Sequence, residues 1–277
     1  MSTFKYWRKI SRLTQCALGG FASYIIALLS DGPAWFTMTK AAAGISMFFS
    51  IWGASVWHYG RCRKVYAKKH WDPVYIKNPR QVLCAGAVGF AISILISAVF
   101  LPAACIIIAI LNAVTIMFLY AKFLDQYWPW KNISIALVCI TPLLMGWFSG
   151  HHLNPIVIPV IIAAFFTYLT REVFKDTVDR EANKGERFTM VMKLGIIATT
   201  KIGGGALIVA ICMFLYSLKY APQSAIVWIL FLGGTGWLAW FAIKSLQGVN
   251  VAPKFVWMDG GIAMILTALL SVRFYTH

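Results

Sequence analysis

Long apolar runs alternate along the chain with shorter polar or strongly basic stretches. An apolar run of about 20 residues is long enough to cross a hydrocarbon core of roughly 30 Å as a helix. Because lipid offers no partners to backbone N–H and C=O groups, each run is predicted to be an α-helix. The pattern predicts an all-α, polytopic membrane protein forming a single domain over residues 1–277, with nine spans near residues 14–30, 34–57, 82–100, 102–121, 133–149, 154–171, 191–217, 223–243 and 256–273.

The composition and the distribution of positive charge agree with this class. Hydrophobic residues make up 60% of the 277, too many for a water-soluble protein of this length. Of the 25 Lys and Arg residues, 21 lie at the N-terminus or around the stretches after the second, fourth, sixth and eighth spans. The positive-inside rule therefore predicts a cytoplasmic N-terminus and a C-terminus on the opposite side, in the inner membrane if the source is bacterial. The net charge of +16 is explained by this topology and by contact with membrane lipids, so no nucleic-acid partner is expected.

Several common kinds of functional site are not indicated. The six cysteines are scattered without a C-x-x-C pair, and the five histidines show no H-E-x-x-H spacing. The sequence also lacks a P-loop, a G-x-S-x-G elbow and a G-x-G-x-x-G fingerprint. A soluble-enzyme motif therefore does not explain the polar residues that remain.

The few carboxylates are concentrated in one place. Four of the nine acidic residues, Glu172, Asp176, Asp179 and Glu181, fall within ten positions at the end of the sixth span. If the span continues as a helix over 171–184, the first three share with Asn183 a stripe about 60° wide. Hard oxygen ligands at this spacing suit Mg²⁺ bridging to a substrate phosphate. The alternative is a solvated helix end whose acids form weak surface salt bridges with neighbouring basic residues.

This stretch resembles a known family motif. Residues 171–183, R-E-V-F-K-D-T-V-D-R-E-A-N, are similar to the second aspartate-rich motif of the UbiA superfamily of intramembrane prenyltransferases, commonly R-E-[IV]-x-K-D-x-x-D-x-x-x-D. Asn183 stands where the last Asp is usual. The segment L-Y-A-K-F-L-D-Q-Y-W-P-W-K-N after the fourth span and the nine-span layout match the family as well.

The resemblance implies a fold, a reaction and a set of site residues. The helices would surround a central cavity, capped by two cytoplasmic loops at 58–81 and 172–190, in which Mg²⁺ binds the diphosphate of an isoprenyl donor. A hydrophobic, aromatic or lipid acceptor would then take the isoprenyl group. Asp176 and Asp179 would be catalytic, and the metal ligands would be Glu172, Asp176, Asp179 and Asn183. The diphosphate would lie near Arg171, Lys175, Tyr120 and Lys122.

The chain departs from the family at the first aspartate-rich motif, usually N-D-x-x-D-x-x-x-D after the second span. Residues 58–81 contain one acid, Asp72, and if helical they place Arg61, Lys64 and Lys68 on one face. Three interpretations follow. The basic side chains hold the diphosphate directly beside a single Mg²⁺. The donor is a different phosphate-bearing molecule, such as a phosphoribosyl or lipid phosphate, or the reaction is a terpene cyclisation. Or the protein has lost catalysis and binds lipid.

A transporter is a further class to weigh. Transporters favour broken spans at corresponding positions of two halves, and Gly203–Gly205 offers only one such break. Lys201, just before these glycines, is a costly residue at membrane depth unless it faces the bundle interior or reaches the interface.

Overall fold

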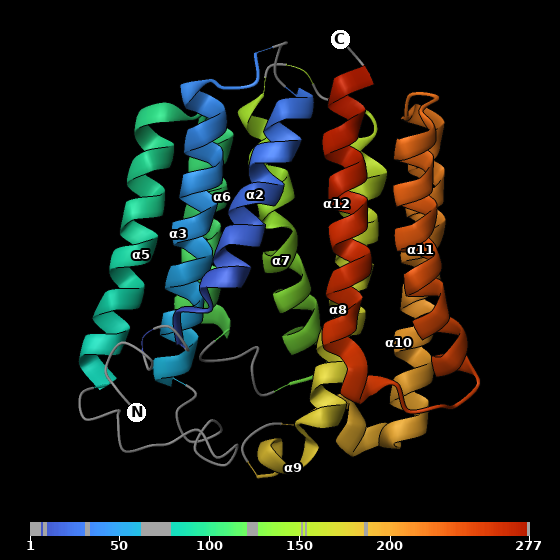
Figure 1. Ribbon diagram of the computed structural model, residues 1–277. Coiled ribbons are helices and arrows are strands. Elements are labelled where there is room, and N and C mark those ends of the chain that lie inside the picture. The colour runs from blue at the N-terminus through green and yellow to red at the C-terminus, as the bar shows by residue number, and fades with distance from the viewer. Residues whose placement is uncertain are drawn as a thin grey trace. The chain divides into compact units, whose positions relative to one another are not determined.

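The protein is described by a computed structural model, shown in Figure 1. The structure describes residues 7, 10–30, 34–61, 79–120, 127–150, 152, 154–185 and 188–275. These residues are almost entirely helical, as the hydrophobic pattern predicts (Figure 1).

The apolar runs of the sequence correspond to the long helices of the described chain. Eight helical segments are long and apolar enough to cross a membrane by length and composition. They contain α2, α5, α6 continued by the π-helical turn η2, α7, α8, α10, α11 and α12. The remaining long helix, α3, carries Lys40, His58 and Arg61 and is therefore more polar than these eight segments. The nine predicted spans therefore match nine long helices within the described residues. Their bounds are α2 Leu13–Ser30, α3 Met38–Arg61, α5 Pro79–Phe100, α6 Ala103–Val114 with η2 Thr115–Tyr120, α7 Trp130–Ser149, α8 Val157–Val178, α10 Met190–Ser217, α11 Ala225–Leu246 and α12 Met258–Tyr275.

The chain divides into two compact units. Unit 1 comprises Met1–Asp125 and Thr141–His152, and unit 2 comprises Gln126–Ile140 and Leu153–His277. Helix α7 contributes its first half to unit 2 and its second half to unit 1. The single domain with a polar cap over 58–81 and 172–190 stays a prediction, because residues 62–78 lie outside the described residues.

In unit 1, helix α3 packs against both α2 and α5 through small residues. A Cβ atom added at Gly53 of α3 would lie 2.8 Å from the carbonyl oxygen of Gly86 on α5. Beside this close approach, the Ser46 hydroxyl lies 3.0 Å from that of Ser93 and 2.8 Å from that of Ser97. Small residues and hydrogen-bonded hydroxyls are what holds helices together where lipid removes the hydrophobic driving force.

In unit 2, helix α10 packs between α8 and α11 in the same way. A Cβ atom at Gly203 would lie 2.6 Å from Cε1 of Phe174 on α8, and one at Gly204 would lie 2.8 Å from Cβ of Ser245 on α11. The Thr170 hydroxyl of α8 donates to the Gly203 carbonyl at 3.0 Å. The glycine run is therefore a packing surface, and it positions the end of α8 that carries the acidic stripe.

Helix α10 has its break at Gly195, before the glycine run. Gly195 has φ 78° and ψ 170°, a left-handed conformation that glycine adopts without a Cβ penalty. Lys201 follows this kink and is exposed, and its Cε lies 3.9 Å from a Cβ built on Gly248, just past the end of α11. Lys201 therefore lies beside the end of α11, and its reach to the membrane interface stays a prediction.

Gly203 provides a test of this packing. We expect Gly203→Ala to lower the thermal unfolding temperature by several degrees, because the new methyl group collides with the fully buried Phe174 ring. Overpacking of this kind costs about 1–3 kcal/mol. The matched control is Gly205→Ala on the same helix, where nothing lies within 4 Å of the added atom. Melting curves of the purified variants in detergent measure both, and equal stabilities would show that the α8–α10 contact is looser than described.

Candidate functional site

The candidate site is built around the end of helix α8 in unit 2. Helix α8 runs to Val178, and after Asp179 the short helix α9, Arg180–Asn183, continues it. Backbone hydrogen bonds of 2.9 Å from Asp179 N to Lys175 O and from Asn183 N to Asp179 O carry the helical turn across this junction. The predicted helical continuation over 171–184 is therefore confirmed as far as Asn183, with a local change of conformation at Asp179.

The acidic stripe is largely buried instead of solvated. Relative exposure is 5% for Glu172, 1% for Asp176 and 1% for Asn183, whereas Asp179 is partly exposed and Glu181 fully so. Buried carboxylates need compensating charge or hydrogen bonds, since an unpaired ion loses its hydration at a cost of several kcal/mol. Glu181 fits the surface salt-bridge interpretation, since its Oε1 lies 4.0 Å from Nε of Arg180.

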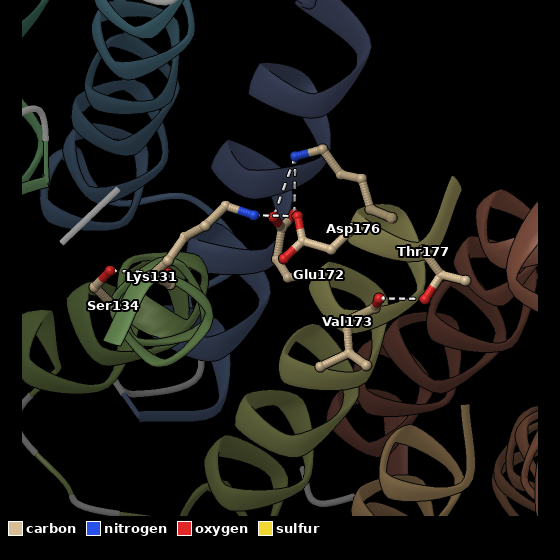
Figure 2. Close-up of polar contacts among 7 residues, drawn as sticks. Lys131, Ser134, Glu172, Val173, Asp176 and Thr177 are labelled. Atoms are coloured by element: carbon tan, nitrogen blue, oxygen red, sulfur yellow. Dashed lines mark hydrogen bonds and ion pairs between the residues drawn. The ribbon is translucent and has the colours of Figure 1, made fainter. Parts of the chain in front are cut away.

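Two lysines supply the compensating charge, and one of them, Lys131, is seen beside Asp176 in Figure 2. Lys131 reaches from the first turn of α7, and its ammonium donates to Oδ1 of Asp176 in a contact buried on both sides. Lys175, one turn along α8 from Glu172, donates to both of its carboxylate oxygens at 3.1 and 3.3 Å. Two carboxylates and two ammonium groups therefore converge at one end of α8.

The position of Lys131 depends on a loop contact at the start of α7. Tyr127 forms an isolated bridge with Phe188, just before α10. The ammonium of Lys193 lies 5.7 Å from the centre of the Trp128 ring, a cation–π contact between the same two segments. The backbone N–H of Lys131 donates to the Tyr127 carbonyl at 3.0 Å. These contacts fix the first turn of α7, and with it the direction in which Lys131 extends.

Several buried polar atoms near this end of unit 2 have no hydrogen-bond partner among the described residues. They are Oδ2 of Asp176, the amide groups of Asn132 and Asn183, and the Thr189 hydroxyl. Buried polar groups are nearly always hydrogen-bonded, so each of these atoms has the capacity to bind a water, an ion or a ligand. Asn132 adjoins Lys131 on α7, and Asn183 ends α9.

These atoms fit a hard divalent cation in part. Oδ2 of Asp176 and the amide oxygen of Asn183 are suitable ligands for Mg²⁺, which keeps several waters and takes further oxygens from a phosphate. Within the described ranges, however, no group of three or more His, Cys, Asp or Glu side chains is arranged to enclose a metal ion. The residues therefore suit a cation that shares its coordination with water or substrate, and not a closed protein cage.

Arg171, predicted to lie near the diphosphate, is engaged elsewhere in unit 2. Its Nε donates to Oδ1 of Asp259 at 3.2 Å, and its guanidinium lies 5.3 Å from the centre of the Phe255 ring. Phe255 belongs to the 3₁₀-helix η5, Ala252–Trp257, and Asp259 to the first turn of α12. Arg171 therefore ties the site-bearing helix α8 to the segment that leads into α12.

Of the other predicted site residues, the structure describes two, Arg61 and Tyr120. Arg61 is exposed at the last position of α3, and Tyr120 is buried at the end of η2 with its ring 5.5 Å from that of His58. Both belong to unit 1. Lys64, Lys68 and Lys122 lie outside the described residues. Their predicted contact with the diphosphate stays a prediction.

Sequence reasoning did not single out Lys131, Asn132 or Thr189. The first two close the segment after the fourth span that resembles the family, so that resemblance was the available signal. Nothing in the local pattern distinguishes Lys131 from the other basic residues that set membrane topology. Its partner Asp176 lies 45 residues away along the chain, and only the fold brings the two together.

Comparisons with known proteins identify a family and solved structures to which this chain is similar. The model of the UbiA prenyltransferase family matches residues 76–269. No curated protein sequence matches the chain. Among solved structures, a digeranylgeranylglyceryl phosphate synthase is similar with a TM-score of 0.76 and 18% identity, covering 99% of each chain.

Two further structures are of a UbiA homolog from Archaeoglobus fulgidus. The form bound to DMAPP and Mg²⁺ has a TM-score of 0.71 at 16% identity, covering 97% of each chain. The form bound to GPP and Mg²⁺ has a TM-score of 0.69 at 14% identity, covering 97% of this chain and 99% of that one. The family model covers more than half of the chain, and eight described helices are long and apolar enough to cross a membrane. This chain is therefore an integral membrane protein that belongs to the UbiA prenyltransferase family.

Proposed function

We propose that this protein is a Mg²⁺-dependent intramembrane prenyltransferase that moves an isoprenyl group from its diphosphate to an aromatic or lipid acceptor. The observation that carries the proposal is the buried contact between Lys131 and Asp176 beside the Lys175–Glu172 pair. A metal–diphosphate site needs two kinds of group. Ammonium groups bind the phosphate oxygens, and carboxylate oxygens bind the cation. Family membership and the DMAPP- and GPP-bound homologous structures support the donor class.

In this proposal the described residues have distinct roles. Asp176 and Asp179 would hold the cation, with Glu172 and the Asn183 amide oxygen in support. When bound, Mg²⁺ neutralises charge on the diphosphate and makes it a better leaving group. The C–O bond of the allylic donor breaks with both electrons going to the diphosphate, and the acceptor supplies the electron pair of the new bond and releases a proton.

Lys131 and Lys175 would stabilise the charge that develops on the leaving diphosphate. Each ammonium donates to phosphate oxygens from a position already held by the protein, so little reorganisation accompanies the reaction. The burial of Lys131 would strengthen its interaction with the phosphate, because the effective dielectric constant there is far below that of water. The orphaned Asn132 amide and Thr189 hydroxyl provide further donors at this end of the unit.

We further propose that the acidic stripe holds one Mg²⁺, and that basic side chains do part of the work of a second. Asn183 replaces the last carboxylate of the motif, and residues 58–81 contain Asp72 as their one acid but seven Lys and Arg. Arg61, Lys64 and Lys68 would bind the diphosphate directly. Of the three interpretations of the altered first motif, this one gives the buried Glu172 and Asp176 a role in holding the metal.

Pyrophosphate release tests the proposal. Purified protein would receive farnesyl or geranylgeranyl diphosphate with a membrane lipid extract or a panel of aromatic acceptors, with and without Mg²⁺. We expect Mg²⁺-dependent release that Asp176→Asn and Lys131→Gln each reduce by about a hundredfold, the usual effect of removing one such charge-stabilising group.

Matched controls separate catalysis from folding. Glu181→Gln, an exposed change two residues after Asp179, should leave the rate unchanged. Because Lys131→Gln leaves a buried carboxylate unpaired, Lys131→Arg is included as a charge-preserving variant, and all variants are checked by melting temperature. Release that is independent of Mg²⁺, or equal in wild type and Asp176→Asn, would contradict the proposal, as would no release from any donor by folded protein.

Arg171 is proposed to position α8 through Asp259 instead of holding the diphosphate. If so, Arg171→Gln and Asp259→Asn should lower kcat by a similar factor, about tenfold, with little change in the donor KM. Asp259→Glu should recover part of the rate because it keeps the ion pair. Steady-state kinetics of the three variants measure this. A donor KM that rises strongly in Arg171→Gln but not in Asp259→Asn would instead place Arg171 on the diphosphate.

The membrane orientation follows from the distribution of basic residues. We propose that the N-terminus and the α8–α9 end face the cytoplasm and that the C-terminus lies on the opposite side. Single cysteines introduced at Ser2 and His277 into a cysteine-free variant would be labelled with an impermeant maleimide in intact cells. Labelling at 277 and protection at 2 is the expected result, and the reverse pattern would show that the orientation is inverted.

A further inference from the structure

A group of three tryptophans and two lysines lies at the join between α11 and α12 in unit 2. It comprises Trp237, Trp240 and Lys244 on α11, Lys254 and Trp257 on η5, and is called here the Trp–Lys patch. Figure 1 shows this join at the lower end of α11 and α12, where the chain turns from one helix into the other. None of these residues takes part in the site described above.

The patch is an ordered arrangement and not a chance collection of exposed side chains. Trp237, Trp240 and Lys244 recur at helical spacing and share a stripe about 60° wide on α11. The ammonium of Lys254 lies 5.6 Å from the centre of the Trp240 ring and 5.3 Å from that of the Trp257 ring, so two cation–π contacts hold it. The Trp237 indole N–H donates to the Trp257 carbonyl at 2.8 Å, which fixes η5 against α11.

Lys244 and Lys254 carry the positive charge of the patch. Among the described residues, neither Lys244 nor Lys254 forms an ion pair with a carboxylate. The acid nearest to the patch along the chain, Asp259, is engaged by Arg171. Each lysine therefore keeps ammonium donors for an external anion, while the tryptophan rings hold Lys254 in place.

The surroundings of the patch identify the kind of anion. Trp237 and Trp240 are 41% exposed and Trp257 is 55% exposed, and Ile243, Leu246 and Val256 beside them are exposed as well. Exposed tryptophans at the end of a membrane helix occupy the headgroup level of the bilayer. Two unpaired lysines at that level attract anionic lipid, with about 1 kcal/mol for each charge near the surface.

We propose that the Trp–Lys patch binds the headgroup of one anionic phospholipid at the membrane interface. Lys244 and Lys254 bind the phosphate, and the indole rings pack against the glycerol and the upper acyl chains. The site is separate from the prenyl-transfer chemistry and stands without it. An anionic lipid fits better than a soluble phosphate, because the tryptophan rings that hold Lys254 are themselves exposed beside an apolar helix long enough to cross a membrane.

Native mass spectrometry of the full chain tests this inference. Wild-type protein in detergent is titrated with phosphatidylglycerol or phosphatidylcholine, and the first bound lipid is counted. We expect phosphatidylglycerol to be retained in preference to phosphatidylcholine, and the Lys244→Gln/Lys254→Gln double variant to bind it at least about tenfold more weakly. Bound phosphatidylglycerol should also raise the melting temperature of the wild type and not of the double variant.

Lys219 provides a matched control at another helix end. Its ammonium lies 6.0 and 5.9 Å from the ring centres of Tyr216 and Tyr220, so it also has two aromatic neighbours. It is the only basic residue between 202 and 243, so no second lysine accompanies it. Lys219→Gln should leave the preference for phosphatidylglycerol intact. Equal binding of both lipids, an unaffected double variant, or displacement of the lipid by pyrophosphate would each overturn the proposal.

Discussion

The buried charges at the end of α8 are the constraint on which the site depends. Glu172 and Asp176 lose nearly all contact with solvent, so each needs a cation within hydrogen-bonding distance. Lys175 forms an ion pair with Glu172 on the same helix, whereas Asp176 forms one with Lys131 of α7. The first turn of α7 must therefore stay in place relative to α8, and the Tyr127–Phe188 bridge and the Lys193–Trp128 contact are the means by which unit 2 holds it.

The neighbours of α8 position it from two further directions. Gly203 lets α10 approach until its backbone accepts a hydrogen bond from Thr170, and Phe174 fills the space that a larger residue would need. Arg171 holds the η5–α12 segment through Asp259 and Phe255. Phe174 and Arg171 alternate along the helix with Glu172 and Asp176. At 100° per residue, Phe174 and Arg171 nevertheless lie about 100° or more around the helix axis from the two carboxylates, so one side of α8 packs against its neighbours while another carries the acids.

The pattern of the sequence predicted the helical class, the approximate bounds of the helices and the helical continuation of the acidic stripe. Hydrophobic length and the absence of backbone partners in lipid decide these features locally. The motif at 171–183 led to the UbiA family, which the family model confirms. The sequence left open whether the acidic stripe is solvated, and the structure shows that it is largely buried. Sequence pattern could not decide this, because burial depends on what the neighbouring helices cover.

Residue types and spacing by themselves determined that this is a helical membrane protein with its scarce acids on one face of one helix. Which cation meets which acid was decided only by the tertiary structure. Arg171 lies beside Glu172 in the sequence yet binds Asp259, 88 residues away, and Asp176 binds Lys131 and not its neighbour Lys175. Helical periodicity specifies the direction of a side chain around its own axis, but an ion pair between helices depends on how close their backbones come. In unit 2 the Tyr127–Phe188 bridge and the Lys193–Trp128 contact hold the first turn of α7, and Gly203 with the Thr170 hydroxyl sets the approach of α8 and α10.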